Sequence, residues 1–228
     1  MKVKYIIMKL TRNYLEKLGV NQLSELSKFV VAENFKHHLN NNLPKDYKRD
    51  ISSIYDEEIS YFNDSEIYVV KDFKGNILGS IRVLKWNYLA VLPLEKIFGI
   101  SPLLVTKKFN ANNIYHIGRF AIKKEVRDIN LFKQLMVCAI APVCKHKENI
   151  AFAECDSKLL RILTLLGIKT TVIGESINYL GSETIPISMN YSGLINFYTK
   201  NKRLVSKESG NNQLKSPFTT SKKIVINI

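Results

Sequence analysis

The segment Tyr115–Ile122, with sequence YHIGRFAI, decides the fold that we expect for this chain. Apolar side chains alternate with others along it, which predicts a strand that is buried on at least one face. Arg119 lies in the middle of this strand among apolar neighbours. A guanidinium in such a place needs a partner, so we expect Arg119 to be half of a buried ion pair or part of a site.

The residues on both sides of this strand predict a hairpin before it and a helix after it. Residues 67–70 and 77–84 read as two strands joined by a turn at residues 72–76. After the basic turn at residues 123–128, Asp128 is well placed to cap a helix. Apolar side chains recur in that helix at the spacing of a buried face: Ile129, Phe132, Leu135, Met136, Ala139, Ile140 and Val143.

The remaining elements are read from periodicity and from turn residues. The sequence predicts helices over residues 21–39, 94–98, 157–166 and 194–198, and strands over residues 150–154, 168–173 and 184–189. Asp156 is the expected cap of the helix that stops at Gly167. This order predicts an α/β (α+β) fold in which a mixed central sheet carries helices on both faces.

The domain organisation follows from length and composition. We expect one domain over residues 1–202 and a basic, loosely ordered tail over residues 203–228, in which residues 224–226 could add an edge strand. No segment approaches the length of a membrane span or has the form of a signal peptide, so we expect a cytoplasmic protein.

The net charge of +14 favours an acidic partner, and nucleic acid, an anionic membrane and an acidic protein all qualify. A proteome rich in lysine and asparagine would give the same charge without any partner. Because no nucleic-acid-binding motif is present, we expect no DNA binding, while peripheral contact with an anionic membrane stays open. The three cysteines and four histidines do not have the spacing of metal ligands, so we expect no metal site and no disulfide.

Three short motifs in order resemble the GNAT acyltransferase superfamily. They are Tyr55-Asp56, the Gly79-Ser80-Ile81-Arg82 that ends the hairpin, and Gly118-Arg119-Phe120 on the central strand. The likeness spans residues 21–200 and is closest to the branch of the acyl-homoserine-lactone synthases and N-acyl amino acid synthases. Tyr179-Leu180-Gly181 and Ile185-Pro186-Ile187 resemble the ending of the amino acid synthases.

The chain also departs from this branch at three places. Val31 stands where an arginine is usual, His116 stands where a carboxylate is usual, and Lys85-Trp86 replaces a Pro-Thr pair. In lactone synthases these positions serve the enzymes' own substrate chemistry. The departures therefore argue against lactone formation more than against acyl transfer.

The resemblance implies where an acyl thioester would bind. Its pantetheine arm would pair in a splay between two central strands, and backbone N–H groups near Phe120, Ala121 and Ile122 would polarise the thioester carbonyl. No Gly-rich loop like those of coenzyme A users follows the strand. Lys123, Lys124 and Arg127 would hold the phosphopantetheine of an acidic acyl carrier protein, or they form an ordinary solvated face.

The resemblance and the chemistry of amide formation assign roles to further polar residues. Deprotonating an α-amino group at neutral pH costs about 1 kcal/mol, so a weak base such as His116 would serve, unless His116 is a core histidine. Arg82 and Arg119 would pair with Asp56 or Glu57 to form the wall of the site, and one of them could hold the acceptor's carboxylate. Glu154 is a further candidate, either as a partner of these arginines or as the base that deprotonates the amine.

An acyl chain would need an apolar tunnel. Phe29, Phe35 and Trp86, together with Phe120, are candidates for its lining, although core packing explains each of them as well.

The sequence thus predicts an N-acyltransferase without a bound cofactor, which uses acyl carrier protein or coenzyme A thioesters as co-substrates. The acceptor would be the amine of an amino acid or similar small molecule. One alternative is an acyl-homoserine-lactone synthase. An alternative of another class is a basic module that binds nucleic acid or membrane and has a catalytically silent GNAT-like core.

Overall fold

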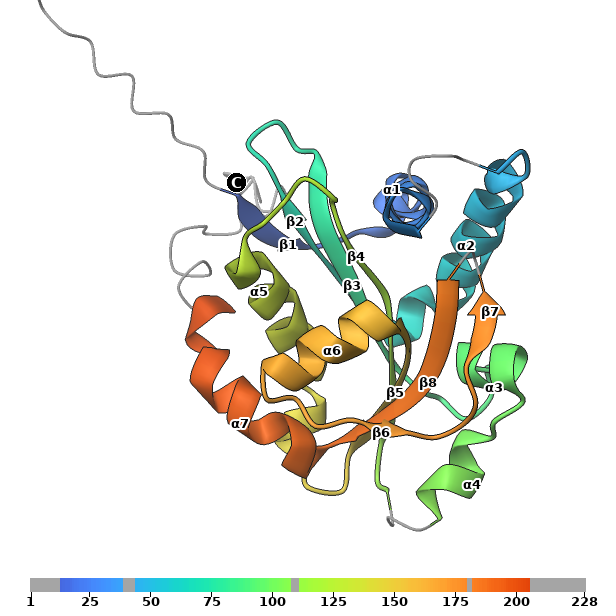
Figure 1. Cartoon of the computed structure of the whole chain (residues 1–228), viewed down its shortest axis with the longest axis vertical. Helices are drawn as coiled ribbons and strands as arrows, with labels where there is room; N and C mark the ends of the chain where they lie inside the picture. The colour runs from blue at the N-terminus through green and yellow to red at the C-terminus, as the bar shows by residue number, and fades with distance from the viewer. Residues whose placement is uncertain (1–12, 39–43, 108–110, 180–181, 206–228) are drawn as a thin grey trace, which may run out of the picture.

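The computed structural model describes residues 13–38, 44–107, 111–179 and 182–205. Within them one twisted sheet runs in the order β1-β2-β3-β4-β5-β8-β6, with β7 also paired to β8 (Figure 1). The strands are β1 (Tyr14–Lys17), β2 (Ser65–Lys71), β3 (Ile77–Lys85), β4 (Ile114–Ile122), β5 (Ile150–Asp156), β6 (Thr171–Val172), β7 (Ile177–Tyr179) and β8 (Ser182–Asn190). The β4/β5 pair is parallel, and all other pairs in this sheet are antiparallel.

Helices cover both faces of the sheet, as expected from the sequence (Figure 1). They are α1 (Leu23–His38), α2 (Tyr47–Tyr61), α3 (Pro93–Phe98), α4 (Pro102–Thr106), α5 (Ile129–Ile140), α6 (Ser157–Leu165) and α7 (Tyr191–Asn201). Neighbouring residues of β2 show the two layers, because successive side chains of a strand point to opposite faces. Val69 packs in a cluster with residues of α1 and α2, whereas Val70 packs in a cluster with residues of α5 and α7. Short 3-10 turns lie at Val20–Gln22, Phe62–Asp64 and Val143–Lys145.

Both predicted helix caps are present. The side chain of Asp128 accepts a hydrogen bond from the backbone N–H of Asn130 at 2.8 Å, and that of Asp156 accepts one from Leu159 at 2.6 Å. Each carboxylate satisfies a donor that the first helical turn leaves free. The caps fix where the two helices begin: α6 follows β5 directly, and α5 follows β4 after the turn at residues 123–128.

Some expected elements differ in the structure. The expected strand over 168–173 is wrong except at β6, while β1, α2, α4 and β7 had not been predicted. Helix α2 was not predicted from the sequence, because it is rich in charged residues and has few apolar residues at helical spacing. It buries only Ile54, Glu58 and Tyr61. Residues 224–226 lie outside the described part of the chain, whereas Val205 packs against the main core. Within the described residues no helix is long and apolar enough to cross a membrane.

Strand β4 carries an irregularity that shapes the centre of the molecule. Its pairing with β3 shifts so that Arg82 lies opposite Gly118 but Ser80 lies opposite Ala121, which leaves an extra residue on β4. Such a bulge often places one residue in the left-handed region, and Arg119 has a φ of +53°. The hydroxyl of Ser80 donates a hydrogen bond to the carbonyl of Arg119 at 2.8 Å and so holds the bulge.

The bulge coincides with the end of the pairing between β4 and β5. The last paired residues are Ile117 on β4 and Ala153 on β5. Beyond them the two parallel strands separate, and β5 continues in pairing with β8 alone. One edge of β4, from Gly118 to Ile122, is therefore left without a strand partner among the described residues.

We predict that Gly193→Ala destabilises the protein by about 1–3 kcal/mol, the usual cost of overpacking. A methyl group at this buried position of α7 would overlap the carbonyl oxygen of Lys169, a backbone atom that cannot swing away. Urea unfolding followed by circular dichroism measures the loss. The exposed Thr199→Ala in the same helix is the control, and an unchanged midpoint for Gly193→Ala would show that the α7 contact is looser than described.

Candidate active site

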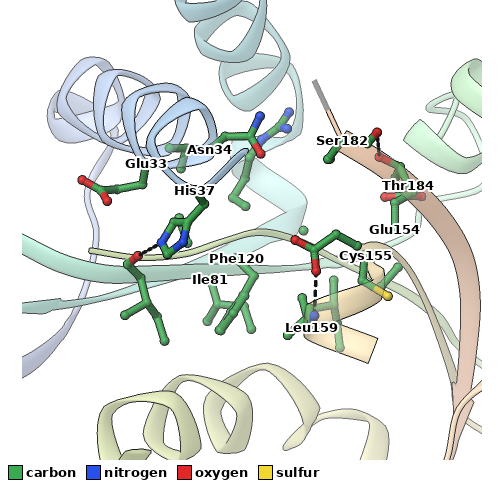
Figure 2. A pocket seen from close by; sticks show the side chains of 18 of the residues that line it. Glu33, Asn34, His37, Ile81, Phe120, Glu154, Cys155, Leu159, Ser182 and Thr184 are labelled. Atoms are coloured by element: carbon green, nitrogen blue, oxygen red, sulfur yellow. Dashed lines mark hydrogen bonds between the residues drawn. The ribbon is translucent and has the colours of Figure 1, made fainter. Parts of the chain in front are cut away.

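A cavity of about 500 Å³ occupies the splay between β4 and β5. Figure 2 shows side chains from α1, β3, β4, β5, α6 and β8 gathered around it. Residues 118–122 form one wall and Ala153 to Asp156 form another. Polar and charged lining residues come from α1 and α2 among other elements, and include Glu33, Asn34, His37, Asp50 and Glu57; the apolar lining near α5 and α6 includes Phe132, Met136, Leu159, Ile162 and Leu163.

A buried cluster of two arginines and two glutamates lies beside the cavity. The carboxylate oxygen Oε1 of Glu58 is 2.7 Å from Nη1 of Arg82 and 2.7 Å from Nε of Arg119. Glu57 contributes its own carboxylate at 2.8 Å from Nη2 of Arg119. Arg82 and Glu58 are fully buried, and Arg119 keeps only 15% of its side-chain surface exposed. Arg119 therefore has the buried ion-pair partners that the sequence led us to expect, and it also lines the cavity.

The electrostatics of the two arginines differ. Burial is the largest influence on Arg82 and lowers its pKa, with Glu58 acting in the opposite direction. For Arg119 burial also lowers the pKa, but the two glutamates outweigh it and the net direction is upward. Both guanidinium groups carry a positive charge, because an arginine side chain is not deprotonated in proteins. Together with Glu57 and Glu58 they form a charge-balanced unit.

His116 joins this cluster to β5. Its Nδ1 lies 2.9 Å from Nη2 of Arg82, and its Nε2 lies 2.9 Å from a carboxylate oxygen of Glu154. Because a guanidinium only donates hydrogen bonds, Nδ1 of His116 must accept, and the proton must then sit on Nε2 and be donated to Glu154. The neutral imidazole therefore has no free lone pair with which to take a proton from a substrate.

Gly118 packs closely against the side chains of Arg82 and His116, which leave little room for a larger residue. A methyl group there would lie 3.1 Å from Nη2 of Arg82 and 3.1 Å from Cε1 of His116. Neither side chain is free to move, because each is buried and hydrogen-bonded. The Gly-Arg-Phe motif thus has a steric reason for its first residue.

The C-terminal end of α1 is fastened to the end of β4. Glu33 accepts a hydrogen bond from the backbone N–H of Lys124 at 2.9 Å, and the Lys124 ammonium donates to the carbonyl of Lys36 at 2.7 Å. His37 donates to the carbonyl of Ile122 at 2.9 Å (Figure 2). The ammonium of Lys124 is therefore engaged within the fold.

His38 reaches the other side of the cavity mouth. It lies 3.2 Å from Asp156, the cap of α6. Burial is the main influence on His38 and lowers its pKa, although Asp156 acts in the opposite direction. Helix α1 therefore contacts the ends of both separated strands.

The structure corrects several positions expected from the sequence. Asp56 is exposed and makes no contact with either arginine, because it faces away on α2 while Glu57 and Glu58 face the sheet. Trp86 is buried in a different cluster with its indole N–H bonded to Ala90, so it does not line the cavity. Phe29 packs against the α1/α2 cluster and is also absent from the lining.

The other expected residues fall at or near the cavity. Its lining includes Phe35, Arg82, His116, Arg119, Phe120, Ala121, Ile122, Arg127 and Glu154. Lys123 and Lys124 lie on the turn at its margin without lining it. Arg82 has no solvent-exposed surface, so in this structure its guanidinium is not open to an acceptor's carboxylate. Among the described residues no group of three or more His, Cys, Asp or Glu is placed to hold a metal ion.

Several lining residues were missed as site residues, and Asp50 and Tyr179 are two examples. Asp50 lies on α2, the helix that sequence periodicity did not reveal. Tyr179 was noticed only as part of a motif; its pKa is raised mainly by burial, and Glu57, Asp50 and Glu154 raise it further.

We predict that Glu58→Gln lowers the free energy of unfolding by about 3–5 kcal/mol, because it leaves two buried guanidinium groups short of one negative charge. Asp56→Asn, two residues away on the exposed side of the same helix, should change stability by less than about 0.5 kcal/mol. Urea unfolding of both variants at neutral pH tests the assignment. Equal losses would contradict the assignment, because they would mean that the exposed Asp56 contributes as much to stability as Glu58.

Comparisons with known proteins identify the fold. No protein-family model matches the chain, and no curated protein matches it. Among solved structures, the N-acyl amino acid synthase FeeM from uncultured soil microbes superposes with a TM-score of 0.60 at 11% identity, covering 85% of this chain and 98% of that one. TofI, solved in a ternary complex with an inhibitor and MTA, superposes with a TM-score of 0.54 at 15% identity. This match covers 82% of this chain and 96% of that one.

A GNAT-family acetyltransferase from Staphylococcus aureus Mu50 gives a TM-score of 0.52 at 14% identity, with 79% of this chain and 99% of that one covered. The coverage is nearly complete on the side of each solved structure, so the match concerns the whole fold and not one motif. The chain therefore has the fold of the GNAT acyltransferases, with an N-acyl amino acid synthase among the structures that it resembles.

Proposed function

We propose that this protein is an N-acyltransferase that moves a fatty acyl group from a thioester to the amine of a small molecule. The observation that carries the proposal is the cavity in the splay, which joins an apolar chamber to a cluster of buried charges. At about 500 Å³ it has the size of a ligand pocket. The fold shared with acyltransferases supports the reaction class.

The free edge of β4 is the proposed site for the donor. A pantetheine arm carries amide groups that can pair with an unpaired strand edge, as an added strand would. The bulge at Arg119 turns the backbone just before Phe120, and N–H groups there would polarise the thioester carbonyl. The acyl chain would continue toward α5 and α6. There the rings of Phe120 and Phe132 pack edge to face, with their centroids 5.1 Å apart.

Glu154 is the proposed general base. Its side chain lines the cavity with 11% of its surface exposed, and His116 orients it by donating a hydrogen bond. In the reaction the amine nitrogen forms a bond to the acyl carbon as the carbon–sulfur bond breaks. The amine's proton passes to Glu154, and the leaving sulfur is released as a thiol after taking up a proton. His116 acts in this scheme as a positioning residue, which replaces the role expected from the sequence.

The donor is proposed to be an acyl carrier protein or coenzyme A thioester. Arg127 and Lys158 both line the cavity mouth and are exposed, so they can meet a phosphate. Since the Lys124 ammonium is bonded to α1, Lys123 and Arg127 are the residues of the basic turn left to meet an acidic carrier protein. The net charge of +14 would speed encounter with such a partner.

The direct test is acyl transfer by the purified full chain, with acyl carrier protein and coenzyme A thioesters from acetyl to palmitoyl and a mixture of amines. Mass spectrometry detects N-acyl products. We predict that kcat/KM rises about fourfold for each added methylene until the chamber is full and then breaks off, since each buried methylene contributes about 0.8 kcal/mol. Leu159→Trp should move the break to shorter chains, whereas Leu165→Trp on the exposed side of α6 should not.

A kcat/KM that does not change with acyl length from acetyl to palmitoyl would contradict the proposed acyl chamber. Complete absence of transfer, together with salt-dependent binding of nucleic acid or anionic vesicles, would support the basic binding module in place of the enzyme. Formation of an N-acyl-homoserine lactone would support the lactone synthase.

Substitutions distinguish the proposed general base, Glu154, from the proposed positioning residue, His116. Glu154→Gln should lower kcat by about 10²–10⁴-fold, the range for loss of a general base. His116→Gln should keep most activity, because a carboxamide can still accept from Arg82 and donate to Glu154, while His116→Leu should lose it. If His116→Gln were as inactive as His116→Leu although folded, His116 would be the base after all. Steady-state kinetics with thiol release as the readout decides between the two.

A further inference from the structure

We infer that the outer face of α6 and the adjoining start of α5 dock this protein on an anionic lipid bilayer, with the mouth of the cavity turned toward the lipid. The inference goes beyond the proposed function, because no step of acyl transfer requires it. It assigns a surface to the peripheral membrane contact that the sequence left open.

Helix α6 buries little of its apolar surface. Five of its nine residues are leucine or isoleucine, yet Leu163 is the one residue of the helix that is buried. Leu165 keeps 76% of its surface exposed, and Ile162 keeps 38%. These two side chains lie on the solvent side of the helix, where a surface helix normally carries polar residues. The fold therefore leaves apolar surface on α6 that its own core does not use.

The exposed residues of α6 include one continuous stripe. Lys158, Arg161, Ile162 and Leu165 are all exposed and are spaced three or four residues apart, so their side chains are neighbours on the helix surface. Two of them are cations and two are apolar, and α6 contains no acidic residue. Lysine and arginine can keep their charges among lipid headgroups while their stems lie along apolar neighbours. Such a combination is typical of helices that lie in a membrane interface.

This stripe adjoins the mouth of the cavity. Lys158 and Ile162 line the cavity, and so do Arg127 and Ile129 at the start of α5. Ile129 keeps 47% of its surface exposed. Because residues of α5 and α6 pack in one core cluster, the two helices lie on the same side of the sheet (Figure 1). This part of the cavity rim therefore presents apolar side chains together with cations.

The charges of this surface favour an anionic partner. Among the described residues Arg127, Lys158 and Arg161 take part in no ion pair. The acidic caps Asp128 and Asp156 each accept a hydrogen bond from a backbone N–H of their own helix. The surface therefore attracts anionic headgroups and repels a second copy of itself.

A bilayer also accounts for the exposed apolar side chains. Nucleic acid would match the cations but would leave Ile162 and Leu165 in water, whereas a bilayer takes up both kinds of side chain. Under the proposed function, a mouth turned toward lipid also gives a fatty amide product a path that avoids water.

Vesicle sedimentation with the purified full chain, without any substrate, tests the inference. We expect binding to vesicles of equal parts phosphatidylglycerol and phosphatidylcholine, and little binding to phosphatidylcholine alone. Leu165→Ser should lower the partition coefficient about tenfold or more, because an apolar side chain no longer enters the interface. Arg161→Gln should lower it about fivefold, equivalent to about 1 kcal/mol for one cation near the lipid.

Both variants should keep the fold by circular dichroism and the acyl transfer rate measured without vesicles, because Arg161 and Leu165 are exposed and do not line the cavity. Leu89→Ser and Arg49→Gln are the matched controls, since both residues are exposed and neither belongs to the α6 surface. They should bind vesicles like the wild type. Equal losses in the controls, or binding that Leu165→Ser leaves unchanged, would overturn the inference.

Other results would also overturn it. Absence of binding to the anionic vesicles at low salt would exclude the bilayer. A raised KM for acyl carrier protein in Leu165→Ser, with vesicle binding intact, would assign the surface to the carrier. A dimer that Leu165→Ser dissociates would assign it to a second copy of the chain. Because vesicle binding is measured without substrates, failure of acyl transfer would remove the proposed function and leave this inference standing.

Discussion

The carboxylate of Glu58, held between the guanidinium groups of Arg82 and Arg119, is the interaction on which the centre of this molecule depends. It joins α2 to β3 and β4 at a buried place, where an unpaired charge of either sign costs several kcal/mol. Because the partners are fixed relative to one another, the bulge at Arg119, the glycine before it and the orientation of His116 are constrained together. A buried ion cluster is a poor source of net stability, but it is a strict determinant of geometry.

The second constraint is the separation of β4 and β5 after Ile117 and Ala153. It produces a free strand edge and a cavity in the same place, with apolar residues of α5 and α6 on one side and carboxylates on the other. Helix α1 stabilises the open arrangement, since Glu33 and His37 bind the end of β4 and His38 binds the end of β5. The apolar and the charged parts of the cavity lining are thereby kept on opposite sides of one opening.

Much of the fold could be read from local patterns, and the errors have identifiable causes. The hairpin, the central strand and both aspartate caps depend on residues close in sequence, so alternation and capping rules predicted them. Helix α2 could not be found in this way, because its buried face includes Glu58, a residue that periodicity counts as exposed. Trp86 was assigned to the acyl pocket on its aromatic character, but its neighbours in space come from the segment around Leu92 and Leu94.

The sequence by itself determined that Arg119 needs a buried partner and that the chain resembles GNAT acyltransferases, because a charge within an apolar strand and three ordered motifs are local properties. Only the tertiary structure decided which partner Arg119 has. Glu58 is separated from it by 61 residues, and neighbouring carboxylates on α2 are indistinguishable until the helix is docked on the sheet. The protonation of His116 was decided in the same way: its two ring nitrogens became distinct only when folding placed a guanidinium on one side and a carboxylate on the other.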